Sequence, residues 1–139
     1  MTPFLLDTNA CIQHLKGRSS LLEANMASVG DTSIVMCAVV VGELFYGASK
    51  SNNPTKAWAI TERFVNRFRS YSFDDRAAKH YGVVRIDLER AGLMIGSNDL
   101  LIASIALANS LTLVTHNVGE FQRVKGLQVA DWQTTAPVT

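Results

Sequence analysis

The chain has 139 residues, a formal net charge of +1, 47% hydrophobic residues and 18% charged residues. This length favours one domain over residues 1–139, large enough to bury a core without disulfide staples. No apolar run approaches the ~20 residues of a membrane span, and the N-terminus lacks the pattern of a signal peptide. We therefore expect no membrane association and a cytoplasmic location, and the near-neutral charge excludes a globally basic nucleic-acid binder.

Two cysteines, Cys11 and Cys37, stand apart in the sequence without the C-x-x-C spacing of redox or zinc sites. Isolated cysteines of this kind are usually reduced thiols packed in the core of a cytosolic protein. We favour that interpretation, although the sequence leaves a disulfide between them open.

Short apolar runs alternate with helical patterns along the chain. In the first half we expect a strand at 3–6, a helix from a Thr8 or Asn9 cap to Gly17, a helix from Ser19 to about Ser28, a strand at 32–36 and a helix at 38–49. In the second half we expect a helical pattern at 55–70, a strand at 71–73, a helix from Asp74 or Asp75 to Ala91, a helix at 98–109 capped by Ser97, and strands at 111–115 and 127–129. This alternation predicts an α/β fold with a parallel sheet covered on both faces, and a frayed tail at 134–139.

Acidic residues stand beside elements that should bring them to one end of this sheet, namely Asp7, Glu43, Asp99 and Glu120. Converging carboxylates repel, at about 4 kcal/mol for two unit charges ~4 Å apart and an effective dielectric near 20. A divalent cation offsets that repulsion, and an oxygen-only site suits Mg²⁺ or Mn²⁺. The pattern therefore predicts a metal-dependent enzyme that acts on phosphate esters.

Glu43 carries more of this argument than the other acids. Asp99 alone could serve the dipole of the helix that it opens, and Asp7 alone could be a helix cap. Glu43 lies in an apolar helix pattern, and no basic residue occurs within four positions of it. A buried acid needs a partner, so a metal or a distant Arg has to supply the positive charge.

Basic residues gather in the stretch 44–73, which contains one acid, Glu62. They are Lys50, Lys56, Arg63, Arg67 and Arg69. Arg63 and Arg67 are four residues apart, which would place them on one helix face, where they could follow a phosphate backbone. Charge alone favours the simpler interpretation, a solvated helix face.

Several short motifs occur together in a fixed order. They are Leu6-Asp7-Thr8-Asn9, Val41-Gly42-Glu43-Leu44, Ile95-Gly96-Ser97-Asn98-Asp99 with Leu100 to Ala103, Leu113-Val114-Thr115-His116-Asn117 with Glu120-Phe121, and a tail with Val124-Lys125-Gly126-Leu127 and Asp131-Trp132. Each motif is weak alone. Together they cover nearly the whole chain and resemble the PIN-domain family, most of all the VapC toxins of bacterial toxin–antitoxin pairs.

The resemblance implies a three-layer α/β/α fold with a central parallel sheet in the order 3-2-1-4-5. It implies an Mg²⁺- or Mn²⁺-dependent endoribonuclease in which Asp7, Glu43 and Asp99 hold the metal. Many PIN domains have a fourth acid where this chain has Asn117, and Glu120 is the candidate to replace it. The residues expected to contact the carboxylates or phosphate, or else to serve as ordinary caps and turns, are Thr8, Asn9, Ser97, Thr115 and Asn117.

The implied reaction is attack of water on a phosphodiester, which leaves a 5′-phosphate and a 3′-hydroxyl. It does not use the 2′-hydroxyl, so RNA as the substrate depends on the resemblance. A structured RNA with an accessible loop, such as a tRNA anticodon arm, would suit a cleft flanked by basic helices.

The resemblance also implies partners: a VapB-type antitoxin, a second copy in a homodimer, and DNA only indirectly through the antitoxin. Helices at 38–49 and 54–70 are candidate contact surfaces. Their aromatic residues Trp58, Phe64 and Phe68 could equally belong to the core of the protein itself.

Other interpretations compete with the nuclease. The fourth acidic position leaves open a PIN-like RNA- or protein-binding module with weak or no catalysis. Metal-free chemistry by His14, His80 or His116 is disfavoured, although His116 stands beside the predicted site and could contact RNA. A haloacid-dehalogenase phosphatase would need a second Asp where Asn9 stands, and a receiver domain would need an acidic pair near the first strand.

Overall fold

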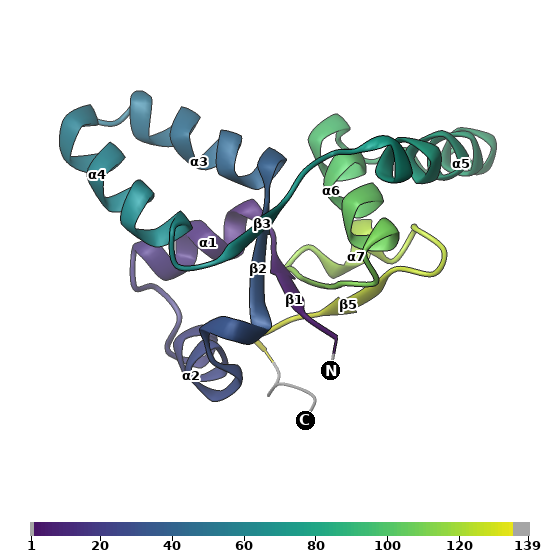
Figure 1. The fold of residues 1–139 in the computed structure, drawn as a ribbon. Helices are drawn as coiled ribbons and strands as arrows, with labels where there is room; N and C mark the ends of the chain where they lie inside the picture. The colour runs from purple at the N-terminus through teal and green to yellow at the C-terminus, as the bar shows by residue number, and fades with distance from the viewer. Residues whose placement is uncertain (1, 135–139) are drawn as a thin grey trace.

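A five-stranded parallel sheet forms the centre of the computed structural model, which describes residues 2–134 (Figure 1). The strand order is β3-β2-β1-β4-β5, and every neighbouring pair is parallel. The strands are β1 (Phe4–Leu6), β2 (Ile34–Cys37), β3 (Arg69–Tyr71), β4 (Thr112–Val114) and β5 (Gln128–Ala130). The predicted strand order is thereby confirmed.

Helices cover both faces of this sheet. They are α1 (Thr8–Leu15), α2 (Ser20–Val29), α3 (Ala38–Ser49), α4 (Pro54–Val65), α5 (Asp75–Ala91), α6 (Ser97–Ala108) and α7 (Val118–Phe121), with a 3₁₀ turn at Asp31–Ser33. Figure 1 shows α1 to α4 gathered on one side of the sheet and α5 to α7 on the other. The three-layer α/β/α architecture is the one that the sequence predicted.

The central strands are apolar along their whole length because both of their faces are covered. Every residue of β1 and β2 is buried, and Leu5 and Leu6 are fully so. Trp132 is also fully buried, with its ring centroid 4.8 Å from that of Phe4. Cys11 and Cys37 are buried free thiols, as the sequence predicted.

The strand order reverses beside β1, and this positions the candidate site. β1 pairs with β2 on one side and with β4 on the other, so the connections that follow β1 and β4 lead toward opposite edges of the sheet. Asp7 directly follows β1, and its N–H donates to the Val114 carbonyl at 3.0 Å. In open α/β sheets such a switch point is where ligands bind.

Two helices begin earlier than predicted, although the sequence had allowed Asp7 as a cap. The cap of α1 is Asp7 itself, whose side chain accepts a hydrogen bond from the Ala10 N–H, so Thr8 already belongs to the helix. The N-cap of α6 is Gly96, and the side chain of Ser97 makes no capping hydrogen bond. In both places the chain turns into the helix one residue earlier than the side-chain preferences suggested.

The fourth helix and the third strand also lie earlier than expected. Helix α4 ends at Val65, and β3 occupies residues 69–71 rather than 71–73. Pairing with β2 sets this position, since Val35 lies opposite Arg69 in the register. The two exposed residues that open β3 gave no apolar signal for a strand.

The basic helix face that the spacing of Arg63 and Arg67 allowed does not form. Arg67 lies beyond the end of α4 and donates hydrogen bonds to Asp31, with 2.9 Å between Nη2 and Oδ1. It therefore does not share a helix face with Arg63, and its charge is compensated by a carboxylate. The interpretation as an ordinary solvated surface fits this part of the chain better.

No helix within residues 2–134 is long and apolar enough to cross a bilayer. The tail predicted to fray at 134–139 falls, after Thr134, outside the described residues. The single-domain organisation over 1–139 stays a prediction.

Candidate active site

The four predicted acids come together at the carboxyl edge of the sheet. Asp7 follows β1, Glu43 lies in α3, Asp99 in the first turn of α6 and Glu120 in α7. The charges of Glu120, Asp7 and Glu43 all act on Asp99, which they could do only at close range. Residues up to 113 positions apart in sequence, from 7 to 120, thus meet in one place.

Asp7 is the most firmly held of these acids. Its side chain is 5% exposed, its Oδ1 accepts the Ala10 N–H at 2.8 Å, and the Thr115 side chain also hydrogen-bonds to it. Burial raises the pKa of Asp7 most, the charges of Glu43 and Asp131 raise it further, and the two hydrogen bonds lower it. The fold therefore confines this carboxylate and supplies it with donors.

Asp99 is held differently. No hydrogen bond to its side chain occurs among the described residues, and its pKa rises from the usual 3.8 to about 6. Burial is the largest cause, followed by the negative charges of Glu120, Asp7 and Glu43. Asp99 thus ionises against the charge of the whole cluster, which is the environment that a cation would relieve.

Glu43 projects from the apolar helix α3 toward the same cluster. Its Oε1 accepts a hydrogen bond from the Thr8 hydroxyl at 2.6 Å, so the first residue of α1 orients the carboxylate. Within residues 2–134 no Lys, Arg or His forms an ion pair with Glu43. The distant Arg that the sequence left open as its partner is therefore not found in the described chain.

Glu120 and Asn117 are joined by a hydrogen bond. The Asn117 amide donates to Glu120 Oε2, the Gly96 N–H donates to Oε1 at 2.9 Å, and the Asn117 N–H donates to Thr115 Oγ1 at 2.9 Å. Helix α7, which the sequence did not predict, turns Glu120 toward α6. Asn117 therefore holds the acid at 120 in this structure, and which of the two serves the fourth position stays a prediction.

Gly96 is a site residue that sequence reasoning missed. A Cβ at this position would lie 3.3 Å from Asp99 Oδ2 and 3.9 Å from Glu120 Oε1. The missing side chain leaves room for both carboxylates at the start of α6. The predicted contacts Asn9 and Ser97, by contrast, are exposed and make no side-chain hydrogen bond within residues 2–134.

The cluster fits a hard cation by its chemistry, since its donors are carboxylate oxygens. In their present positions, however, no three Asp, Glu, His or Cys side chains of residues 2–134 form a group that could hold a metal ion. Thr8, Asn117 and Gly96 occupy oxygens of Glu43 and Glu120 with local hydrogen bonds. On Glu120 small side-chain rotations would have to exchange these donors for a cation, whereas Glu43 could offer its other oxygen and keep the bond from Thr8.

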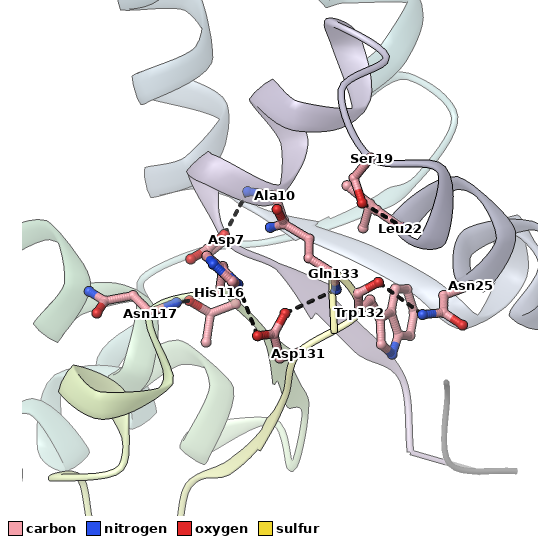
Figure 2. A network of polar contacts seen from close by, with 11 residues as sticks. Asp7, Ala10, Ser19, Leu22, Asn25, His116, Asn117, Asp131, Trp132 and Gln133 are labelled. Atoms are coloured by element: carbon pink, nitrogen blue, oxygen red, sulfur yellow. Dashed lines mark hydrogen bonds and ion pairs between the residues drawn. The ribbon is translucent and has the colours of Figure 1, made fainter. Parts of the chain in front are cut away.

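His116 and Asp131 form a second polar pair at this edge of the sheet (Figure 2). His116 Nδ1 lies 2.9 Å from Asp131 Oδ2, and the Asp131 charge reaches Asp7. The sequence placed His116 beside the site, and it named Asp131 only as part of the tail motif. The two residues meet because they follow the paired strands β4 and β5.

A groove of about 570 Å³ runs from the cluster along α1, α3 and α4. Its lining includes Glu43 at one end, the apolar residues Ile12, Leu15, Leu44 and Ile60, and the basic residues Lys16 and Lys50. A second groove of about 560 Å³, along α5, contains none of the four acids. Chemistry therefore favours the first groove as the one that serves the site.

Comparison with known proteins finds relatives along almost the whole chain. A family model described as the PIN domain matches residues 4–127. The chain is 34% identical over 132 residues to the tRNA(fMet)-specific endonuclease VapC of Salmonella typhimurium (strain LT2), covering 95% of this chain and 99% of that protein. It is 35% identical to Ribonuclease VapC2 of Rickettsia felis, covering 93% of this chain and 97% of that protein.

Solved structures are similar along the same length. DNA-bound VapBC from Salmonella typhimurium matches with a TM-score of 0.89 and 34% identity, covering 95% of this chain and 99% of that one. VapBC2 from Rickettsia felis, bound to a DNA fragment from its promoter, matches with a TM-score of 0.87, 34% identity and coverage of 94% and 99%. Fold, length and sequence thus agree over almost the entire chain.

Proposed function

The chain belongs to the PIN-domain family, in its VapC branch, and from that premise we propose that it is an endoribonuclease that acts as the toxin of a toxin–antitoxin pair. The convergence of four carboxylates at the end of the sheet carries the proposal. Such a cluster suits a divalent cation and the hydrolysis of phosphate esters. The names of its full-length relatives, endonuclease and ribonuclease, agree with that chemistry.

Mg²⁺ or Mn²⁺ is the cation that we propose for the site, with Asp7, Glu43, Asp99 and Glu120 as its ligands. When bound, it would offset the repulsion among the carboxylates and make a phosphodiester more susceptible to attack by water. Thr8 would then keep Glu43 oriented from behind, as it does through its 2.6 Å hydrogen bond.

Asp99 is the carboxylate that we propose to accept a proton from the attacking water. No described residue hydrogen-bonds to its side chain, so one of its oxygens is free to take the proton. Both oxygens of Glu120 already accept hydrogen bonds, which makes it the weaker candidate. The water oxygen would bond to phosphorus as the P–O3′ bond breaks, and the leaving 3′-oxygen would take a proton from solvent.

The proposed substrate is RNA with an accessible single-stranded loop, and a tRNA is the first candidate. A relative of nearly equal length is named a tRNA(fMet)-specific endonuclease. Exposed bases in a loop can be splayed into a shallow site, whereas a duplex hides them. Cleavage of tRNA would inhibit translation and would place the activity in the cytoplasm.

The groove along α1, α3 and α4 is the surface that we propose for a VapB-type antitoxin. It combines apolar side chains with Lys16 and Lys50 and ends at Glu43, so a bound segment could reach the acids. On α3 Tyr46 is 67% exposed and on α4 Trp58 is 44% exposed, whereas Phe64 is buried in the core. The aromatic residues of this region are thus divided between the core and a free surface.

The remaining partners follow from the similar complexes. Two of these are VapBC assemblies bound to DNA, one of them to a promoter fragment. We propose that this chain contacts DNA only indirectly, through the antitoxin, and that it forms a homodimer.

Cleavage by the purified protein tests the proposed activity. Cellular RNA is incubated with Mg²⁺, with Mn²⁺ or with EDTA, and new 5′ ends are mapped. We expect cuts with either metal, none with EDTA, and a loss of about 100-fold or more in Asp7→Asn and Asp99→Asn. Asp87→Asn, on the exposed surface of α5, serves as the matched control.

The same experiment separates the nuclease from the alternative of a non-catalytic binding module. A module of that kind would retain RNA without producing new 5′ ends under any metal condition. Cleavage that persists in both variants, with folding unchanged, would come from a contaminant or from another site.

A further inference from the structure

His116 is fixed in place by a carboxylate from the neighbouring strand end. Its Nδ1 lies 2.9 Å from Oδ2 of Asp131, whose Oδ1 accepts the Gln133 N–H at 2.9 Å (Figure 2). The side chain of Asp131 is 13% exposed, and that of His116 is 60% exposed. A largely buried partner thus orients an imidazole that remains open to solvent.

This pair adjoins the acidic cluster on the chain and in space. Thr115, one residue before His116, hydrogen-bonds to Asp7, and Asn117, one residue after it, donates to Glu120. Asp131 lies close enough to Asp7 for its charge to act there. An RNA phosphate bound at the carboxylates would therefore place an adjoining sugar near the imidazole.

The hydrogen bond to Asp131 decides what the other ring nitrogen can do. An ionised carboxylate only accepts hydrogen bonds, so Nδ1 has to be the donor. In the neutral imidazole Nε2 then carries a lone pair and acts as an acceptor. Within residues 2–134 no group donates to Nε2. The exposed edge of His116 is thus an oriented acceptor without a donor.

The proposed hydrolysis leaves RNA selection unexplained, because water attacks the phosphate and the 2′-hydroxyl takes no part. A protein that cuts only RNA needs a group that binds this hydroxyl. We propose that His116, positioned by Asp131, accepts a hydrogen bond from the ribose 2′-hydroxyl of a nucleotide beside the scissile phosphate. This inference rests on the proposed ribonuclease function and assigns its selectivity for ribose to one residue.

A protein–substrate cycle tests the contact. A synthetic RNA that spans one mapped cleavage site is prepared with a single 2′-deoxy substitution at each nucleotide around the cut. For wild type we expect one position to lose about 5-fold in kcat/KM, mostly through KM, as for one neutral hydrogen bond. In His116→Ala the same substitution should cost less than about 2-fold, because the partner is already gone.

Two conservative variants refine the test. His116→Gln places an amide oxygen near the position of Nε2 and should retain part of the sensitivity to 2′-deoxy substitution. His116→Asn can still reach Asp131 but not the sugar, so it should behave like His116→Ala. His80→Asn, on the exposed surface of α5, is the matched control and should leave the 2′-deoxy effect unchanged.

Asp131→Asn examines the positioning role. Gln133 N–H requires an acceptor from residue 131, so the amide nitrogen of the new Asn would face His116 Nδ1. Nδ1 would then accept, and Nε2 would carry the proton. We expect wild type to lose activity on a 2′-fluoro nucleotide, because fluorine can only accept a hydrogen bond. In Asp131→Asn the ratio of activity on the 2′-fluoro substrate to activity on the 2′-hydroxyl substrate should rise by about 3-fold or more.

The outcomes distinguish this inference from the function on which it rests. If wild type cuts RNA and its 2′-deoxy profile is the same in His116→Ala, the hydroxyl contact is refuted and the nuclease stands. If wild type cuts no RNA with either metal, the proposed function fails first. A fall in kcat/KM of His116→Ala that is equal for RNA and for every 2′-deoxy substrate would make His116 merely structural.

Discussion

Asp7 and Asp99 reach the same cluster from opposite sides and are held in opposite ways. Asp7 caps α1, and its carboxylate has donors from the Ala10 N–H and the Thr115 side chain. Asp99 has no side-chain hydrogen bond among the described residues, and its pKa is raised to about 6 by burial and by the other acids. The fold supplies hydrogen bonds to one carboxylate, whose pKa burial nevertheless raises, and supplies none to the other.

This contrast indicates which part of the site is preformed. On the side of β1 and α1 the site is in place without a ligand, because the Asp7 carboxylate also caps α1. On the side of α6, Asp99 is repelled by the other acids until a cation, or a positively charged group of a partner, binds. Substitutions on the two sides should therefore differ in their effect on stability even where they agree in their effect on cleavage.

Divalent cations should produce the largest effect on this contrast. At about 100 times the dissociation constant, Mg²⁺ or Mn²⁺ should stabilise the wild-type protein by about 2–3 kcal/mol. In Asp99→Asn the metal-free protein should be more stable and the gain from the cation much smaller. Thermal denaturation with EDTA and with each cation measures both quantities.

Asp87→Asn controls for non-specific cation binding and should behave like wild type in both conditions. An unchanged cation gain in Asp99→Asn would show that Asp99 is not a ligand. The contrast between Asp7 and Asp99 would then not reflect cation binding, and the raised pKa of Asp99 would need another explanation.

Alanine substitutions of Asp7 and Asp99 should have different effects on stability in the absence of metal. Asp7→Ala removes the cap of α1 and leaves the Ala10 N–H and the Thr115 side chain without their partner, which should destabilise the fold by about 1–2 kcal/mol. Asp99→Ala removes no hydrogen bond and relieves repulsion, so it should be neutral or stabilising. Urea denaturation in EDTA measures the difference, and equal losses in both variants would contradict it.

The sequence was sufficient for the elements whose burial shows in their composition. β1, β2 and β4 are nearly continuous apolar runs because both faces of the central sheet are covered. Glu43 was identified as a site candidate for a related reason, since an acid within an apolar helix needs a partner for its charge. The strand order came from the family resemblance rather than from periodicity.

The errors lie where position depends on pairing between distant segments. β3 is an edge strand with two exposed residues, and its register against β2 decided its place. The four-residue helix α7 is too short for a periodic signal, so the contact between Asn117 and Glu120 was missed. His116 and Asp131 are 15 residues apart, and only the pairing of β4 with β5 brings them together.

The pH dependence of stability should carry the signature of Asp99. Its folded pKa of about 6 exceeds the usual 3.8, so the folded state binds this proton more tightly than the unfolded chain does. The stability from this group is fully present below pH 3.8 and is lost as pH rises to about 6. Between about pH 4 and pH 7, metal-free wild type should lose on the order of 1 kcal/mol relative to Asp99→Asn, after allowance for solvent screening.

Parallel denaturation curves for the two proteins across this range measure that loss. Asp7 titrates in the same direction in both proteins, so taking their difference removes most of its contribution. A constant difference from pH 4 to pH 7 would mean that Asp99 ionises in the fold as it does in the unfolded chain.

Gly96→Ala should give the smallest change in stability and the most selective one in activity. The φ of −56° at this position suits alanine, but alanine is a poorer N-cap than glycine, so the expected loss is about 0.5 kcal/mol. The added methyl, however, would lie 3.3 Å from Asp99 Oδ2, and the side chain can yield because no hydrogen bond restrains it. RNA cleavage should therefore fall by about 10-fold while Tm hardly changes, since a small displacement of a reacting group is costly.

Gly119→Ala, where an added Cβ meets nothing within 4 Å, is the matched control. Equal cleavage by both variants would mean that the added methyl does not disturb Asp99. The start of α6 would then be less crowded than the raised pKa of Asp99 implies.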